Sequence, residues 1–187
     1  MSDNPQHRTR RLAAAIFAAT ALLMTAGASP AWADDDASAT TAAPAPYCWA
    51  DTESQVTTCY PSEEQLDAAI VARTGSAAIE QGSELARSRA IVSPLAVYTI
   101  ARLYEDASYG GSFITVTAGS STICASSSVS VPSMPSGWND RVSSFRSYYS
   151  CTTRAYENAS YGGASLSGTN VSSMSTMNDK TSSYRVS

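Results

Sequence analysis

The chain has 187 residues, a net charge of −4 at pH 7, 43% hydrophobic residues and 15% charged residues. An acidic chain lacks the basic patch that nucleic acids and anionic membrane surfaces need, so neither is expected as a partner. Its length fits one domain with an appendage.

The first 33 residues have the order of a secretory signal peptide. Three arginines within the first eleven residues precede an uncharged stretch from Leu12 to Ala28, and the sequence AWA at 31–33 comes just before three aspartates. The uncharged stretch is shorter than the roughly 20 residues of a membrane-spanning helix, so an uncleaved anchor is the weaker alternative. We therefore predict a signal peptide over 1–33 and a secreted protein with no membrane segment after cleavage.

The only histidine, His7, lies in this predicted signal peptide. Its removal excludes Ser-His-Asp and Cys-His mechanisms and histidine-ligated zinc in the exported part. Glycoside hydrolysis by paired carboxylates needs no histidine and is not excluded on this ground. Small, serine-rich loops are poorly suited to form the sides of a sugar-binding cleft, however, so we do not expect an enzyme.

Two short segments precede the main part of the exported chain. Residues 34–46 are acidic and rich in Ala, Thr and Pro, which predicts a disordered leader. Residues 47–95 form a small N-terminal segment with a disulfide-closed loop or hairpin and a helix from about Pro61 to Thr74. The helix begins with a capping-box pattern at Ser62, ends before Gly75, and places Leu66, Ala69, Ile70 and Ala72 on about one face. Residues 76–89 could be a second short helix or a linker.

Four cysteines, Cys48, Cys59, Cys124 and Cys151, all lie in the exported part, which indicates disulfides. Three pairings are possible. We favour Cys48 with Cys59 and Cys124 with Cys151, because each pair closes a short loop within one apparent module. Neither pair has the CxxC spacing of a zinc site.

The last part of the chain is rich in Val, Ile, Thr and Tyr and is punctuated by Gly, Ser and Pro, which predicts an all-β domain of short strands over 96–187. Within it, two phrases occur twice in the same order. YEDASYGG at 104–111 is matched by YENASYGG at 156–163, and WNDRVSSFR at 138–146 by MNDKTSSYR at 177–185. The first phrase predicts a hairpin in which Gly110 and Gly111 are free to take positive φ.

The second phrase gathers oxygen atoms, which is why it suggests a cation site. Asn139, Asp140 and Ser143 are repeated as Asn178, Asp179 and Ser182. Ca²⁺ takes six to eight oxygen ligands and accepts backbone carbonyls and water among them. A single Asn-Asp loop is more often an Asx-turn followed by a capping serine, but two copies, each after an aromatic-glycine hairpin, favour calcium.

The pairing of Tyr-x4-Tyr-x-Gly with Asn-Asp-x-x-Ser-Ser, twice within residues 101–187, resembles the microbial βγ-crystallin domain. The resemblance implies a sandwich of two Greek keys with calcium as its ligand. It implies Asp140 and Ser143 as side-chain ligands at one site, Asp179 and Ser182 at the other, and loops shaped by Asn139 and Asn178. Each site would be completed by a backbone carbonyl from the partner motif's hairpin, at Glu105 and Glu157.

Two other functions are weighed beside calcium binding. Some small secreted metalloproteinase inhibitors share the crystallin-like fold, and the insertion at 124–137, tethered at Cys124 and stiffened by Pro132 and Pro135, could serve as a reactive loop. An enzyme would have to use Glu105 with Asp106, or Glu157, and hairpin positions like these are expected to face solvent. We expect a calcium-binding monomer, with a secreted metalloproteinase as a possible partner.

Overall fold

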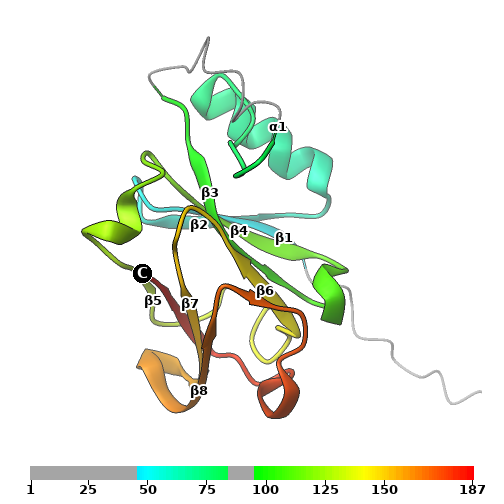
Figure 1. Ribbon diagram of the computed structural model, residues 1–187. Helices are drawn as coiled ribbons and strands as arrows, with labels where there is room; N and C mark the ends of the chain where they lie inside the picture. The colour runs from blue at the N-terminus through cyan, green and yellow to red at the C-terminus, as the bar shows by residue number, and fades with distance from the viewer. Residues whose placement is uncertain (1–45, 84–94) are drawn as a thin grey trace, which may run out of the picture. The chain divides into compact units, whose positions relative to one another are not determined.

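A computed structural model describes residues 46–83 and 95–187 (Figure 1). The predicted signal peptide and the leader up to residue 45 lie outside the described residues. So does the end of the second predicted helix or linker, 84–89; its described part, 76–83, contains no helix. No helix in the described part of the chain is long and apolar enough to span a membrane.

The N-terminal segment consists of a hairpin and a helix, as predicted. Strands β1 (Tyr47–Asp51) and β2 (Val56–Tyr60) pair antiparallel, and the predicted disulfide joins Cys48 to Cys59 at directly opposite positions of the two strands. Helix α1 (Glu63–Thr74) begins where the Ser62 hydroxyl accepts a hydrogen bond from the Gln65 N–H.

One face of α1 packs on the hairpin. The buried helix residues are Leu66, Ile70 and Thr74, which follow one another at four-residue spacing. Ala72, expected on this face, is exposed instead, because the buried stripe is narrow and continues through Thr74. Leu66 and Ile70 share a small hydrophobic cluster with Trp49 of β1.

The two repeats fold into two similar four-strand motifs. The first contains β3 (Tyr98–Tyr104), β4 (Phe113–Ala118), β5 (Val129–Val131) and β6 (Ser144–Ser147), and the second β7 (Thr153–Asn158), β8 (Gly162–Gly168), β9 (Asn170–Val171) and β10 (Ser183–Val186). Short 3₁₀ helices lie at Ala107–Tyr109, Ile123–Ala125, Ala159–Tyr161 and Ser175–Met177.

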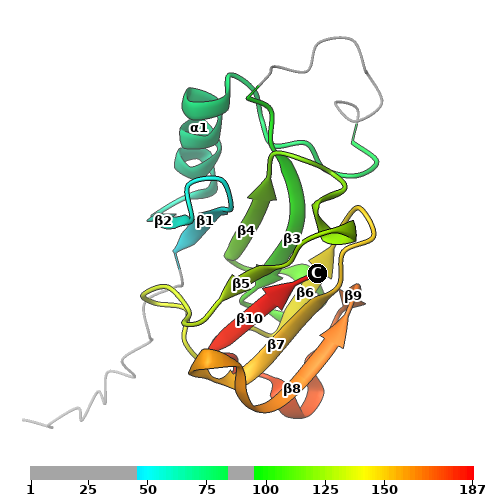
Figure 2. The same ribbon diagram turned by 90° about the vertical axis from the view of Figure 1, so that its left-hand side faces the viewer.

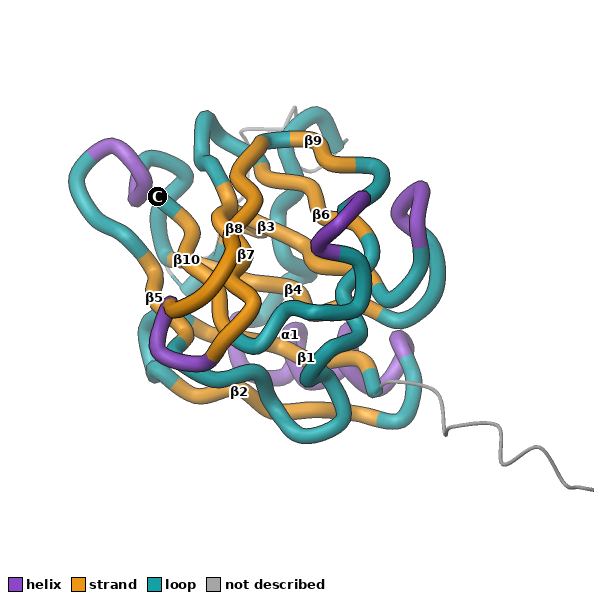
Figure 3. Tube along the Cα trace, turned by 90° about the horizontal axis from the view of Figure 1, so that it is seen from below, coloured by secondary structure: helices purple, strands orange, loops and turns teal. Residues whose placement is uncertain are grey.

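The motifs form a sandwich by exchanging their third strands. One sheet has the order β2-β1-β4-β3-β6-β9 and the other β5-β10-β7-β8, so β9 lies beside β6 of the first motif and β5 beside β10 of the second (Figure 3). In each motif the fourth strand pairs with the first strand, as in a Greek key. The predicted sandwich of two Greek keys is therefore confirmed.

The N-terminal hairpin is built into this sandwich. Strand β1 pairs in parallel with β4, so β1 and β2 extend the first sheet beyond the crystallin-like repeats (Figure 2). Helix α1 lies on the face of this sheet that points away from the second sheet (Figure 1). The disulfide between Cys124 and Cys151 is also the predicted one.

Equivalent residues of the two repeats meet in the core. Phe145 on β6 and Tyr184 on β10 occupy the same place in the two phrases, and both are fully buried in the main cluster. The Tyr184 hydroxyl has no hydrogen-bond partner among the described residues. A buried hydroxyl without a partner is costly. Tyr184 therefore has an unfavourable group at the position where the first repeat has Phe145.

We expect Tyr184→Phe to raise the free energy of unfolding by about 1 kcal/mol at pH 7, because it removes only the unpartnered hydroxyl. Burial also raises the pKa of Tyr184. The unfolded chain then loses the phenolic proton first, so stability is complete below pH 10 and falls above it. Urea unfolding at pH 7 and pH 11 should show a larger advantage of the variant at pH 11. Equal advantages at the two pH values would show that folding does not raise the pKa of Tyr184.

Candidate metal centre

Each of the two predicted calcium sites lies beside a folded hairpin that connects the first two strands of a motif. The tyrosine rings of Tyr104 and Tyr109 lie 5.7 Å apart, and those of Tyr156 and Tyr161 lie 5.6 Å apart. The guanidinium groups of Arg146 and Arg185, which end the Asn-Asp phrases, stack on Tyr109 and Tyr161. The two phrases of each repeat therefore meet in space.

Only the second glycine of the hairpin takes positive φ. Gly111 has φ 72°, whereas Gly110 has φ −99°, so only one of the two glycines uses this freedom. The turn reaches its shape because Ser108 and Tyr109 also adopt positive φ, and one glycine then suffices to close it.

Gly111→Ala is expected to lower the free energy of unfolding by about 1–3 kcal/mol, because a side chain is strained at this φ. In addition, an added Cβ would lie 2.7 Å from Asp106 Oδ2. Gly110→Ala is the matched control, since its Cβ would meet nothing closer than 3.5 Å. Chemical denaturation of both variants measures the difference, and an equal loss in both would show that the positive φ is not the cause.

The second serine of each Ser-Ser pair holds the hairpin. The Ser144 hydroxyl donates to the Asp106 carbonyl at 2.6 Å and accepts from the Tyr109 N–H at 3.0 Å. Ser183 makes the same two bonds, to the Asn158 carbonyl at 2.6 Å and from the Tyr161 N–H at 3.0 Å. Both serines are fully buried. No role was predicted for them from the sequence, although the serine doublet, present in both copies, was a visible signal.

The first serine of each pair reaches the aspartate of the other repeat. Ser143 Oγ donates to Asp179 Oδ1 at 3.0 Å, and Ser182 Oγ lies 3.3 Å from Asp140 Oδ1. Backbone bonds hold the loops in this arrangement: the Asp140 N–H donates to the Thr181 carbonyl at 3.1 Å, and the Asp179 N–H to the Val142 carbonyl at 3.2 Å.

The contacts between the loops cross the expected grouping of the ligands, which stays a prediction. The sequence placed Asp140 with Ser143 and Asp179 with Ser182, because each pair belongs to one loop. The structure instead brings Asp179 to Ser143 and Asp140 to Ser182, because the two loops lie against each other across the interface between the motifs. Ser143 also lies beside its own motif's hairpin, where its N–H donates to the Tyr104 carbonyl.

The two asparagines orient the aspartates. The Asn139 side-chain amide donates to Asp140 Oδ2 at 2.6 Å, and that of Asn178 donates to Asp179 Oδ2 at 2.7 Å. Asp140 and Asp179 have φ of 58° and 53°, a region that aspartate tolerates better than most residues. Each carboxylate thus has one oxygen held by its neighbour and the other directed to the opposite serine.

The two glutamates lie at the start of the hairpins. Glu105 Oε1 forms an ion pair with the Arg141 guanidinium at 2.7 Å, and Glu157 Oε2 accepts from the Ala164 N–H at 3.2 Å. A cavity of about 340 Å³ is lined by Glu105, Asp106, Asp140, Arg141, Ser143 and Asp179. At the first site the hairpin, the first serine and the opposite aspartate therefore share one hollow.

The side chains gathered at these loops offer oxygen atoms, which suit a hard cation better than a soft one. No group of three or more His, Cys, Asp or Glu side chains suited to a metal occurs in residues 46–83 and 95–187. A cation at these loops would depend on one aspartate, one serine and backbone carbonyls. Calcium accepts such neutral oxygens together with water.

The insertion at 124–137 is held at both ends. Cys124 is bonded to Cys151, β5 pairs with β10, and Met134 and Trp138 are buried. Residues 125–128 are exposed. Inhibition of a metalloproteinase through this loop stays a prediction from the sequence.

Comparison with solved structures finds βγ-crystallin domains. A domain from Clostridium beijerinckii is 21% identical, with 46% of this chain and 95% of that chain covered and a TM-score of 0.37. A domain from Flavobacterium johnsoniae is 25% identical, with 47% and 93% covered and a TM-score of 0.36. A βγ-crystallin from an archaeon is 26% identical, with 46% and 95% covered and a TM-score of 0.35.

No protein-family model matches the sequence, and the search of curated proteins gives no match. The assignment of a crystallin-like fold to residues 98–187 rests on their own strand order, in which each motif places its third strand in the other sheet.

Proposed function

We propose that the protein, which has a βγ-crystallin-like fold over residues 98–187, is a secreted protein that binds two Ca²⁺ ions and is stabilised by them. The observation that carries the proposal is the pair of crossed contacts between Ser143 and Asp179 and between Ser182 and Asp140. An ion at each contact would replace a hydroxyl–carboxylate hydrogen bond by bonds from both oxygens to the same cation.

Each ion would join the two motifs. The aspartate comes from one repeat and the serine from the other, so a bound ion ties together loops that belong to different Greek keys. Ions that bind the folded state alone stabilise it, by about 2.7 kcal/mol at a free concentration one hundred times the dissociation constant. With one carboxylate per site we expect dissociation constants of roughly 10⁻⁵ to 10⁻³ M, in the range of extracellular modules.

The proposed secretion fits the same function. Two disulfides are the bonds of an oxidising compartment, and the first 33 residues have the order of a signal peptide. Calcium at roughly millimolar concentration would fill the tighter sites of this range and half-fill the weakest.

Calcium titration of the chelator-treated protein tests the proposal. We expect two binding events and a melting temperature that rises with Ca²⁺, and a much smaller rise with Mg²⁺, which requires near-ideal octahedral geometry and dehydrates reluctantly. Asp140→Gly together with Asp179→Gly, which removes both carboxylates at positions of positive φ, should abolish both effects of calcium. A melting temperature that still rose with calcium in this variant would show that the ligands lie elsewhere.

A further inference from the structure

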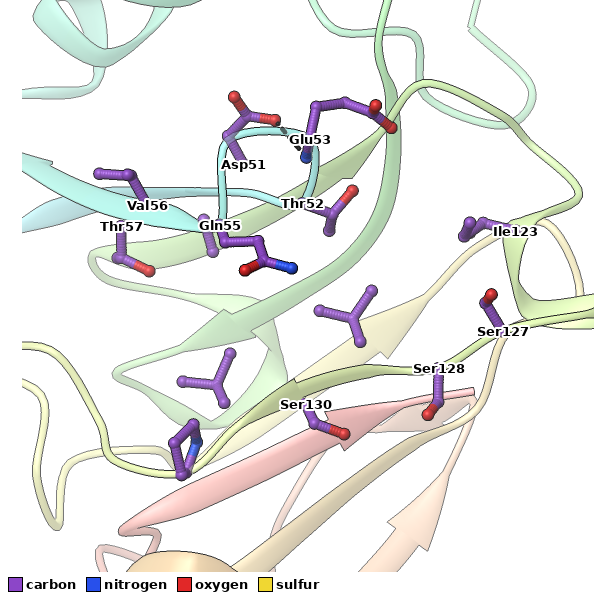
Figure 4. A pocket seen from close by; sticks show the side chains of 14 residues that line it. Asp51, Thr52, Glu53, Gln55, Val56, Thr57, Ile123, Ser127, Ser128 and Ser130 are labelled. Carbon is purple, nitrogen blue, oxygen red and sulfur yellow. Dashed lines mark hydrogen bonds between the residues drawn. The ribbon is translucent and has the colours of Figure 1, made fainter.

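Two hollows in the described part of the chain differ in whether charged side chains face them. The larger one, of about 490 Å³, lies between the β1–β2 hairpin and β5, and the carboxylates of Asp51 and Glu53 at its border point away from it (Figure 4). Asp51 is paired with Arg73 at 2.8 Å, and Glu53 Oε1 accepts from the Gly119 N–H at 3.1 Å. Both carboxylates are thus engaged outside this hollow, and it offers little to a cation.

The smaller hollow, beside Ser143, is lined by one basic residue and four acidic ones. The basic residue is Arg141, whose Nη2 lies 2.7 Å from Glu105 Oε1, the distance of a charge-assisted hydrogen bond. The Arg141 and Glu105 side chains keep 26% and 19% of their surface exposed, so water screens this ion pair only in part. A positive charge of the protein itself therefore lies at the first site, the one at Ser143 and Asp179.

The second site, at Ser182 and Asp140, has no such ion pair within the described part of the chain. Lys180 stands where the first repeat has Arg141, but its side chain is exposed and forms no ion pair with a residue in 46–83 or 95–187. Glu157, the counterpart of Glu105, accepts from a backbone N–H instead. Side-chain chemistry explains the difference, because an arginine fork fits a carboxylate, whereas a lysine ammonium is compact and strongly hydrated.

We propose that Arg141 competes with calcium at the first site and makes it the weaker of the two sites, a role that rests on the proposed function. The guanidinium repels a divalent ion held by Ser143 and Asp179, because like charges in one hollow raise the free energy of the bound state. It also neutralises the Glu105 carboxylate, which would otherwise add negative charge beside the ion. Calcium affinity depends on the charge of the surrounding ligands.

An additional aspartate does not reverse this order. The first hairpin has Asp106 where the second has Asn158. A Cβ added to Gly111 would lie 2.7 Å from Asp106 Oδ2, so this carboxylate is folded back over its own hairpin. Arg141 instead spans the hollow from the Asn-Asp loop to the hairpin. We expect the first site to bind calcium about fivefold more weakly than the second.

The same ion pair holds the first site together without calcium. It joins the Asn-Asp loop to the hairpin, which are the two parts that a bound ion would also connect. Calcium therefore replaces an existing link at the first site and adds a new one at the second. Two sites of unequal affinity respond to calcium over a wider range of concentration than two equal sites.

Arg141→Gln tests the proposal, with Lys180→Gln as the matched control for the loss of one positive charge. Two-dimensional NMR spectra during calcium titration report on each site separately, through the amide signals of the hairpins at 104–111 and 156–163. In the natural sequence the second hairpin should reach its midpoint at about fivefold lower calcium than the first. Arg141→Gln should remove most of this gap by tightening the first site, whereas Lys180→Gln should move each midpoint by about twofold or less, because an exposed charge is screened.

Stability without calcium is the second readout. Urea denaturation of the chelator-treated protein should show that Arg141→Gln is less stable than the natural sequence, although its melting temperature rises more with calcium. A merely structural role would lower stability equally with and without the ion. Arg141→Lys keeps the positive charge but lacks the fork, so it should tighten the first site less than Arg141→Gln does.

The titration separates the role of Arg141 from calcium binding itself. If the signals of neither hairpin move with calcium, the proposed function fails and the competition fails with it. If both hairpins respond but their midpoints are equal, or Arg141→Gln leaves the first midpoint unchanged, calcium binding stands and the role of Arg141 is overturned.

Discussion

Ser144→Ala and Ser183→Ala are each expected to lower the free energy of unfolding by about 2–4 kcal/mol. Each buried hydroxyl satisfies one carbonyl and one N–H of a hairpin, and alanine leaves both without a partner. An unsatisfied buried polar group costs about 1–3 kcal/mol, and each change leaves one part-buried carbonyl and one part-buried N–H without this partner. Urea denaturation without calcium is the measurement, because it separates this structural role from any ion.

The neighbouring serines provide the matched controls. Ser143→Ala and Ser182→Ala remove hydroxyls only one position away in the sequence, which contact the opposite aspartates and not the hairpin backbone. In the absence of calcium they should lower stability by about 1 kcal/mol or less, since the carboxylates retain their asparagine partners and access to water. Comparable losses in all four variants would contradict the division of roles between the two serines.

Local patterns in the sequence account for the parts of the fold that depend on neighbouring residues. The helix was predictable because Ser62 and Gly75 are capping residues at the correct spacing. The hairpins were predictable because the tyrosines and glycines recur with one spacing in both copies. The disulfides followed from module boundaries, since each pair closes a short loop.

Contacts between the repeats could not be predicted in this way. Asp179 meets Ser143 rather than Ser182 because two similar loops pack face to face, and no local pattern distinguishes that packing from two separate loops. The parallel pairing of β1 with β4 was hidden for a similar reason. It depends on the open edge of β4, which exists only after the first Greek key has formed, and the sequence therefore left the docking of this segment undecided.

The crossed arrangement predicts opposite results for two double variants that share one change. Asp179→Gly with Ser143→Ala removes both side-chain ligands of a single site, and glycine tolerates the positive φ at this position, so one calcium ion should still bind. Asp140→Gly with Ser143→Ala removes one ligand from each site, so calcium binding should be weakened at both. If the ligands were grouped by loop, the two outcomes would be exchanged.

Calorimetric titration and thermal melts distinguish these cases. The first variant should retain one binding event and about half of the calcium-dependent stabilisation, because a single site still contributes about 2.7 kcal/mol at one hundred times its dissociation constant. The second should show little heat and little rise in melting temperature at the same concentration. Both variants keep one intact Asn-Asp pair and both hairpin serines, so their calcium-free stabilities should be similar. A difference that appears only with calcium then belongs to the ligands, and its direction shows which aspartate shares an ion with Ser143.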